Sequence, residues 1–368
     1  MSGTYLIAGA GPTGLAAGLA LTRLGCAVRI VDRGPPTPPS ESRALAVNPR
    51  SLDLLEPSGV TERLLAEGHR ITRMQLHRWG RGRTRLVQEV PFGDLPHRLP
   101  FMLALPQGRV EAVLEAALAE QGVPVERGTE LTGLATPGRP GVTLHCPQGT
   151  VEMRPEALLA ADGAHSTVRQ ALGLDFPGYR YEADWQLADY RLVTDLAPDA
   201  GHVVLRPDGF LFLLRFGDGL WRAMSTRRDL EAILPEGCRI EAEQWRSTFR
   251  ISHRLVDRFQ VGQVYLAGDA AHLHSPLGAR GMNLGIEDAM VFAHLGADGR
   301  LAQYNMRRRK VDRAVVRQID LLTRIATGAS PLWRPARNRL LPVLLGLGPV
   351  QDMARRRATG LSPSGGWE

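Results

Sequence analysis

The chain has 368 residues, of which 43% are hydrophobic and 23% charged, a composition typical of a globular protein with one large or two smaller domains. The net charge of +7 comes almost wholly from arginine, because Lys310 is the only lysine, and this argues against Schiff-base chemistry. The three cysteines, Cys26, Cys146 and Cys238, are far apart and lack CxxC spacing. We therefore expect no disulfide framework, no thiolate zinc site and a reducing, cytoplasmic location.

The charged and apolar runs do not favour a nucleic-acid partner or a membrane span. The arginine-rich runs at 307–310 and 355–357 fall in predicted C-terminal helices and are interpreted as solvated surface. The apolar stretch 5–21 is nearly long enough to span a bilayer, but Gly-Ala-Gly-Pro interrupts it and no positively charged leader precedes it. A second apolar run, 340–348, is too short. A weak contact with a membrane surface stays open, as does the choice between monomer and homodimer.

The first predicted elements are a buried strand over 4–9, a helix that ends at Gly25 and a second buried strand over 26–32. In the cluster between strand and helix, Gly9 permits a tight turn, Gly11 lets the backbone approach a pyrophosphate, and Gly14 lets helix and strand pack closely. The helix N-terminus would offer N–H groups to phosphates. This pattern predicts an adenine dinucleotide, either NAD or FAD, with these candidate binding residues: Gly9, Gly11, Pro12, Thr13, Gly14, Asp32 and Arg33.

Further helices and strands follow along the chain. A helix is expected to begin after Pro49, and 105–123 predicts an amphipathic helix with Val110, Val113, Leu114, Ala117 and Leu118 on one face. Residues 157–173 predict a strand, a turn at 162–163 and a helix bearing Ser166 and Arg169. Residues 262–276 predict a strand ending at Gly268-Asp269, and a helix begins at about Gly281.

Antiparallel β structure is predicted between these segments. Residues 202–225 predict three strands with turns at 207–209 and 217–219, and 71–87 predicts a hairpin. Residues 303–328 predict a long helix whose inward stripe is Val311, Val315, Ile319 and Leu322.

The segment GDAAHLHSPLGARGMNLGIEDA, residues 268–289, supports two interpretations. Asp269, His272 and His274 would ligate a metal if the segment were extended. No other histidine, cysteine or carboxylate cluster is expected nearby, so we predict no metal, structural hydrogen bonds for His272, and a pocket-edge or surface position for His274. The glycines instead let a flat ligand lie against the backbone.

Three motifs occur in a fixed order: GxGxxG at 9–14, DGxxSxxR at 162–169 and GDAAHxxxPxGxxGxNxxxxDA at 268–289. Together they resemble the class A flavoprotein monooxygenases, the para-hydroxybenzoate hydroxylase-like aromatic hydroxylases. The resemblance implies an α/β fold with a Rossmann-like FAD-binding domain, an inserted, mostly antiparallel β-sheet substrate domain and C-terminal helices. It assigns 1–70, 100–175 and 260–330 to the FAD-binding domain, 71–99 and 176–259 to the substrate domain, and 331–368 to a C-terminal helical segment.

The resemblance also implies roles for particular residues. Arg43 and Gln107 would contact the ribityl–pyrophosphate region, Asp162 and Gly163 would serve both FAD and the incoming nicotinamide nucleotide, and Gly268 and Asp269 would bind the ribityl side. The flavin ring would lie along Pro276, Gly278, Arg280, Gly281, Met282 and Asn283, of which the first three would form the catalytic ring environment without supplying a nucleophile. Backbone N–H groups near Gly281 would stabilise the negative charge of reduced flavin. Many relatives have Gly-Gly-Gln-Gly where this chain has Gly-Ala-Arg-Gly, so Arg280 either adds positive potential near the flavin or faces solvent.

The activity that the resemblance implies is oxygen insertion. NADPH or NADH would reduce FAD, O2 would form a flavin C4a-hydroperoxide, and its distal oxygen would hydroxylate a small aromatic or polyketide-like substrate. Candidate pocket walls, each of which also suits ordinary sheet core, are Met74, Leu76, Phe212, Leu214 and Met224; Trp185, Tyr190 and Arg222 are further candidate anchors. Two alternatives stay open: an FAD-dependent reductase or dehydrogenase of an unsaturated lipid or isoprenoid, and a non-catalytic FAD-binding protein.

Overall fold

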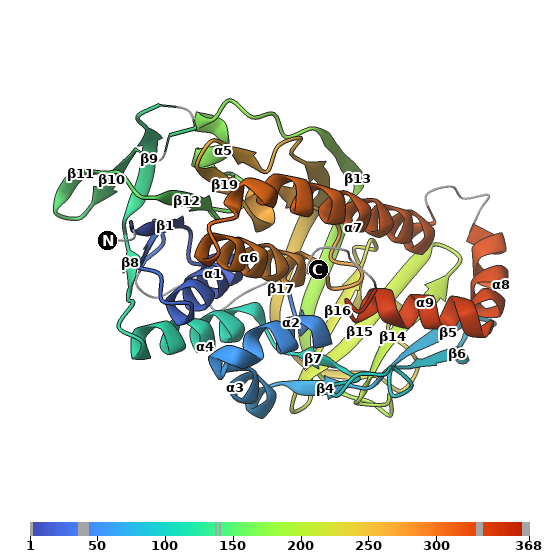
Figure 1. Cartoon of the computed structure of the whole chain (residues 1–368). Helices are drawn as coiled ribbons and strands as arrows, with labels where there is room; N and C mark the ends of the chain where they lie inside the picture. Colours follow the sequence, from blue (N-terminus) through green and yellow to red (C-terminus); the bar gives the residue numbers. More distant parts are fainter. Residues whose placement is uncertain (1–2, 36–43, 137, 140, 329–333, 363–368) are drawn as a thin grey trace.

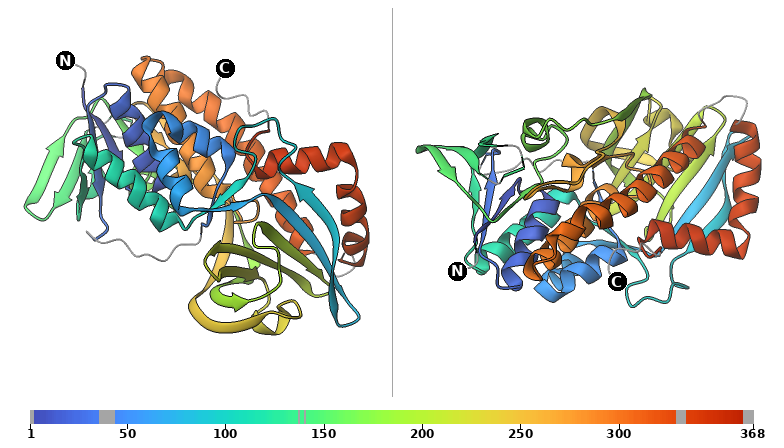
Figure 2. Two further views of the ribbon diagram at one scale, coloured as in Figure 1. Left: turned by 90° about the horizontal axis from the view of Figure 1, so that it is seen from below. Right: turned by 45° about the horizontal axis from the view of Figure 1, so that its top comes forward.

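The computed structural model describes residues 3–35, 44–136, 138–139, 141–328 and 334–362. Two large sheets organise these residues, one of six strands and one of eight. The six-stranded sheet with its surrounding helices and the eight-stranded sheet occupy different ends of the molecule (Figures 1 and 2). The predicted α/β fold class is therefore confirmed.

The six-stranded sheet has the order β18-β19-β12-β1-β2-β8, and all of its pairs are parallel except β18–β19. Every residue of β1, β12 and β19 is buried, as expected where helices cover a parallel sheet. Helix α1 (Pro12–Arg23) lies between α4 (Gln107–Glu120) and α6 (Gly281–Ala297) (Figure 1). The strands are β1 (Tyr5–Ala8), β2 (Val28–Asp32), β8 (Val125–Arg127), β12 (Ala157–Ala160), β18 (Gln260–Val261) and β19 (Val264–Leu266).

The eight-stranded sheet has the order β20-β17-β13-β16-β15-β14-β5-β6, with a single parallel pair, β14–β5. The predicted hairpin is confirmed as β5 and β6, and the three strands predicted over 202–225 are confirmed as β14, β15 and β16. The strands are β5 (Arg73–Gly80), β6 (Arg83–Pro91), β13 (Gly178–Val193), β14 (Ala200–Arg206), β15 (Gly209–Gly217), β16 (Leu220–Ser225), β17 (Arg239–Leu255) and β20 (His272–Leu273). How the chain divides into domains stays a prediction.

Two small antiparallel sheets and several short helices complete the part of the chain around the six-stranded sheet. One sheet has the order β11-β10-β9 and the other β3-β7-β4. The elements are β3 (Ala46–Val47), α2 (Pro49–Leu55), α3 (Val60–Glu67), β4 (His69–Ile71), β7 (Met102–Ala104), β9 (Glu130–Leu134), β10 (Val142–Cys146), β11 (Gly149–Met153) and α5 (Thr167–Ala171). Helix α4 buries the five apolar residues predicted for its inner face.

Helix α7 (Tyr304–Thr327) runs from the six-stranded sheet toward the eight-stranded sheet (Figure 1). Its predicted inward stripe is right for Val311 and Ile319 but wrong for Leu322, which is 43% exposed, while Val315 is only half-buried. Both misplaced residues line a cavity instead. The interior positions are taken partly by Arg308 and Asp312, which are buried because they pair with each other.

The C-terminal helices α8 (Arg334–Leu345) and α9 (Gly348–Ala358) contact β6, the edge strand of the eight-stranded sheet (Figure 1). Among the residues that the structure describes, no helix is both long enough and apolar enough to span a bilayer.

Candidate functional site

Three glycines shape the turn between β1 and α1. Gly9 has φ +105°, and a Cβ there would lie 2.2 Å from the carbonyl oxygen of Ala161. A Cβ on Gly14 would lie 1.9 Å from the carbonyl oxygen of Gly9. Gly11 differs, because its φ is −77° and a Cβ there would meet only Glu111 Oε1, at 4.0 Å. The fold thus requires glycine at positions 9 and 14. The backbone at Gly11 is instead uncovered at the N-terminus of α1, and such a position suits a phosphate group.

Thr13 joins the first and third motifs. A Cβ on Gly268 would lie 2.5 Å from Thr13 Oγ1, and one on Gly285 would lie 2.2 Å from it. The hydroxyl of Thr13 therefore fills the contact between α1 and α6, while Pro12 occupies the first turn of α1. This packing brings the two glycine-rich segments together in space.

Asp32 ends β2 beside the glycine turn. Its Oδ2 accepts a hydrogen bond from the backbone N–H of Ala10 at 2.7 Å, and its Oδ1 accepts from Gly34 N–H at 2.7 Å and from Arg127 Nη1 at 3.3 Å. The carboxylate therefore fixes the turn, in addition to its predicted role in binding the dinucleotide.

Three other predicted cofactor residues have different environments. Arg33 is largely exposed and lies 3.9 Å from Glu130, so its side chain belongs to the surface. Arg43 lies outside the described residues. Gln107 begins α4, lines the cavity described below and donates from Nε2 to Glu111 Oε1 at 2.8 Å.

Asp162 follows β12 and offers an acceptor without a protein partner. Its Oδ2 accepts from Val168 N–H at 3.2 Å, at the start of α5, whose N-cap is Ser166. Oδ1 is buried and has no hydrogen-bond partner among the described residues. Burial raises the pKa of this carboxyl above its ordinary value. Together with the φ of +81° at Gly163, this arrangement leaves an oriented acceptor that fits a ligand hydroxyl.

The third motif turns sharply between β20 and α6. Gly278 and Ala279 are consecutive residues with positive φ, +84° and +51°, and Ala279 N–H donates to the Pro276 carbonyl at 3.0 Å. Positive φ is uncommon for a non-glycine residue and marks a backbone conformation that the surroundings impose. Pro276 and the exposed Asp269 both line the cavity.

The N-terminus of α6 presents backbone donors at this loop. The first helical hydrogen bond runs from Leu284 N–H to the Arg280 carbonyl at 2.7 Å. The N–H groups of Gly281, Met282 and Asn283 therefore precede the helical ladder and carry the positive end of the helix dipole. Gly281 and Met282 also line the cavity.

The side chain of Asn283 is engaged within the protein. Its Oδ1 accepts from Asn48 N–H at 2.9 Å, and its Nδ2 donates to the carbonyls of Ala46 at 2.9 Å and Ala279 at 2.6 Å. The amide thus clamps the loop and α6 to β3 and α2, so what Asn283 can offer a ligand is its backbone N–H.

Arg280 is 5% exposed, so the alternative in which it faces solvent is wrong. Its Nη2 donates to Glu287 Oε1 at 2.9 Å, and the other oxygen of Glu287 lies 3.6 Å from Nε of Arg50. Two guanidinium groups thus share one fully buried carboxylate, which leaves an excess positive charge behind the loop.

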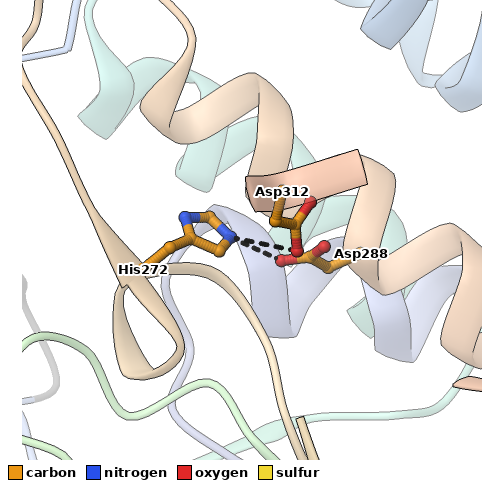
Figure 3. Close-up of side chains that lie close together, drawn as sticks. All are labelled: His272, Asp288 and Asp312. Carbon is orange, nitrogen blue, oxygen red and sulfur yellow. Dashed lines mark hydrogen bonds and ion pairs between the residues drawn. The ribbon is translucent and has the colours of Figure 1, made fainter. Parts of the chain in front are cut away.

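His272, Asp288 and Asp312 meet in the interior (Figure 3). His272 Nε2 lies 2.8 Å from Asp288 Oδ2, and the three side chains offer ligand atoms within 4.8 Å of one another. The expectation that no carboxylates gather near His272 is therefore wrong: Asp288 lies 16 residues on and Asp312 lies on α7. The predicted structural hydrogen bond of His272 is confirmed.

A cation already occupies this cluster. Arg308 Nε donates to Asp288 Oδ1 at 2.5 Å, and Arg308 Nη2 donates to Asp312. Burial alone would raise the pKa of Asp288, but Arg308 and His272 hold it at about 2. Burial raises the pKa of Asp312 well above its ordinary value. Arg308 thus takes the place beside the two carboxylates that a metal ion would need.

A cavity of about 1220 Å³ lies between the third-motif loop, α7, the C-terminal helices and one face of the eight-stranded sheet. This volume exceeds the roughly 300–1,000 Å³ of ordinary small-molecule pockets, so the cavity has room for more than one ligand group. All five predicted wall residues, Met74, Leu76, Phe212, Leu214 and Met224, line it. His274 also lines it, and burial lowers the pKa of His274 to about 3.

Of the candidate anchors, only Arg222 lines the cavity. It is 4% exposed and forms two 2.7 Å hydrogen bonds to Asp189. Tyr190 lies in a core on the other side of the sheet and donates to Glu231 at 2.8 Å, and Trp185 is fully buried. The anchoring role predicted for Tyr190 therefore has no geometric support, whereas Trp185 packs among cavity-lining residues and its buried Nε1 has no partner among the described residues.

Sequence reasoning missed the half-buried Arg50 and the buried carboxylates Glu287, Asp312 and Asp189. One signal was present: Arg308 and Asp312 are spaced i,i+4, which pairs them on one helical face. Nothing in the sequence shows that Arg50 on α2 meets Glu287 on α6.

Comparison with known proteins agrees with this geometry. The family described as "FAD binding domain" matches residues 4–319, and the chain belongs to that family. The chain is 35% identical over 363 residues to 6-methylpretetramide 4-monooxygenase of Streptomyces rimosus. The matched region covers 93% of this chain and 64% of that protein. It is 30% identical to pentachlorophenol 4-monooxygenase of Sphingobium chlorophenolicum, over 77% of this chain and 56% of that one. The resemblance to the FAD-dependent aromatic hydroxylases is thus confirmed.

Solved structures share the fold across nearly the whole chain. The anhydrotetracycline hydroxylase OxyS of Streptomyces rimosus superposes with a TM-score of 0.80 at 26% identity, covering 98% of this chain and 76% of that one. The p-nitrophenol 4-monooxygenase PnpA of Pseudomonas putida shows the fold at 22% identity, with a TM-score of 0.83 and 98% of both chains covered. The chain spans less than two thirds of the length of the two curated relatives described above.

Proposed function

We propose that this protein is an FAD-dependent monooxygenase that uses NADPH or NADH and O2 to hydroxylate an aromatic or polyketide-like small molecule. The observation that carries the proposal is the large cavity, because one of its walls is the glycine-rich loop and another is the apolar face of a β-sheet. The names of the relatives, which include monooxygenases of pentachlorophenol and of tetracycline precursors, support the substrate class.

The residues present fit FAD at the level of backbone and charge. Each of the three motifs contributes one feature: the open backbone at Gly11, the acceptor Asp162 Oδ1, which has no partner among the described residues, and the N–H groups that precede the helical hydrogen bonds of α6. We propose that they hold the pyrophosphate, a hydroxyl and the ring edge respectively. We propose that further residues predicted from the sequence also contribute to the FAD site: Gly9, Pro12, Thr13, Gly14, Asp32, Gln107, Gly163, Gly268, Asp269, Gly281, Met282 and Asn283.

Bound FAD would supply the redox chemistry: it accepts hydride from the nicotinamide nucleotide and activates O2. The chain's own part is to orient the ring and to exclude water. Pro276 and Gly278 shape the loop beside the ring, and the apolar face of the sheet keeps the reacting edge dry. The positive potential of Arg280 and of the α6 N-terminus would stabilise negative charge on the reduced ring.

The state of the cysteines bears on where in the cell the protein acts. Cys26, Cys146 and Cys238 are free thiols, as suits a cytoplasmic protein with access to reduced nicotinamide nucleotides. We propose that the protein acts there as a monomer or homodimer without a nucleic-acid partner.

The test is a screen of phenols and polycyclic polyketides for substrate-stimulated NAD(P)H oxidation, with mass spectrometry of the product. We expect O2 consumption and a product heavier by one oxygen atom. Saturation of a double bond without O2 consumption would show a reductase, and an FAD-loaded protein inert across the panel would contradict the proposal.

A further inference from the structure

Apolar side chains form an exposed rim around the opening of the cavity. Among the described residues, four large apolar side chains are exposed and also line the cavity: Leu321 and Leu322 on α7, Leu344 on α8 and Met353 on α9. A side chain that lines a cavity and also meets solvent lies at the cavity's opening. Three helices therefore frame the opening with apolar groups, and two of them, α8 and α9, lie beside β6 (Figure 1).

The exposed apolar surface continues from this rim along α8. Its further members are Leu340 and Val343 on α8 and Leu347 in the turn before α9. Leu341 and Leu345, on the inner side of α8, line the cavity, so the second half of this helix is apolar on both sides. A helix that is apolar all round is ordinarily buried, and an exposed apolar patch marks a place where a partner binds. We call the four rim residues and these three further members the mouth surface.

Positive charge flanks the mouth surface. Four cations there are exposed and form no ion pair with other described residues: Lys310 and Arg317 on α7, Arg339 on α8 and Arg357 on α9. Lys310 and Arg357 line the cavity themselves, whereas Arg339 directly precedes Leu340. Exposed apolar side chains with cations beside them are typical of helices that lie in the interface of an anionic membrane.

The same charge argues against a second copy of this chain as the partner. Two copies joined through the mouth surface would bring equal sets of cations together, and each chain carries a net charge of +7. Like charges that face one another across an interface oppose association. An anionic bilayer instead attracts each cation that comes within the screening length of its surface.

We propose that the mouth surface docks this protein on the surface of an anionic lipid bilayer, with the opening of the cavity toward the lipid. Docking would move the exposed apolar side chains from water into the headgroup region, while the flanking cations contact lipid phosphates. No segment has to cross the bilayer, and among the described residues no helix is able to do so. The docking does not depend on the proposed function, because neither hydride transfer nor substrate takes part in it.

The test is co-sedimentation of the full chain, with excess FAD, with lipid vesicles. Vesicles of phosphatidylcholine and phosphatidylglycerol in equal parts are compared with vesicles of phosphatidylcholine alone. Each cation near an anionic surface adds about fivefold to the affinity, so we expect binding at least about tenfold tighter to the mixed vesicles. High salt should weaken this binding because it screens the charges. A chain that sediments with neither kind of vesicle, or equally with both, would overturn the proposal.

Matched valine substitutions locate the contact. Val343 on α8 is 66% exposed and Val151 on β11 is 42% exposed, and the two elements lie at opposite ends of the molecule (Figure 1). Neither side chain belongs to a hydrophobic core, so V343S and V151S should fold as the wild type does. We expect V343S to weaken binding to the mixed vesicles at least about threefold and V151S to leave it unchanged. Unchanged binding in V343S, or an equal loss in V151S, would contradict the assignment.

Two further results test the orientation and the rival partner. Leu321 lies on α7, across the opening from α8, so L321S should also weaken binding at least about threefold. Wild-type binding by L321S would show that the opening does not face the lipid. Analytical ultracentrifugation without lipid measures the rival partner: a dimer that V343S dissociates would overturn the proposal in favour of a second copy.

Discussion

Replacing Gly11 by alanine separates cofactor binding from folding. The backbone at Gly11 is already in a conformation that alanine adopts, and its Cβ would have 4.0 Å of clearance. Alanine is a poorer N-cap than glycine by about 0.5–1 kcal/mol, while a less flexible unfolded chain offsets about 0.4–1 kcal/mol. The free energy of unfolding of G11A without FAD should therefore stay within about 1 kcal/mol of wild type. If a pyrophosphate lies against this backbone, the new methyl group should weaken FAD binding at least about tenfold, or 1.4 kcal/mol.

The assay is a titration of FAD fluorescence quenching, with urea unfolding of the FAD-free proteins alongside. G14A is the matched comparison, because its Cβ would lie 1.9 Å from the Gly9 carbonyl and the turn itself must move. We expect G14A to lose both stability and FAD binding, and G11A to lose only FAD binding. A G11A protein that binds FAD with wild-type affinity would refute the placement of the pyrophosphate.

Three further predictions test the buried charges and the cavity. D288N removes the balancing charge of Arg308 and should destabilise the fold by about 3–5 kcal/mol in urea unfolding; a loss below about 1 kcal/mol would contradict the balanced pair. Burial lowers the pKa of His77, a residue of β5, to about 4. As the pH falls, the unfolded chain therefore takes up a proton at this histidine before the folded protein does. The free energy of unfolding should fall by up to about 3 kcal/mol between pH 6.5 and pH 4. The H77Q variant should show a smaller fall in the free energy of unfolding over this pH range, and a fall as large as that of wild type would rule out His77 as its cause. L322D places a charge on the cavity face of α7 and should raise KM for an apolar substrate about tenfold at unchanged FAD content, whereas an unaltered KM would place the substrate elsewhere.

Local patterns predicted the elements that carry the motifs. The α4 face, the β14–β16 meander and the start of α6 at Gly281 each depend on residues close in sequence, so periodicity and turn residues determine them. The open position of Gly11 beside the crowded Gly14 also follows from the spacing of one motif.

Local sequence patterns could not predict the ion pairs between residues that are far apart in the chain. Arg50 and Glu287 meet only because α2 and α6 pack together, and Leu322 faces a cavity that exists only once α7 crosses toward the eight-stranded sheet. The buried position of Arg280 depends on its pairing with Glu287, seven residues further along the chain and about two turns into α6.

The most direct test of the account is FAD binding by the wild-type protein. We predict a yellow protein that carries one FAD per chain and rebinds FAD after removal, with a dissociation constant of about 1 µM or lower. A folded protein that stays colourless and takes up no FAD at concentrations about a hundred times higher would contradict the account, because the three glycine-rich segments would then have no common ligand.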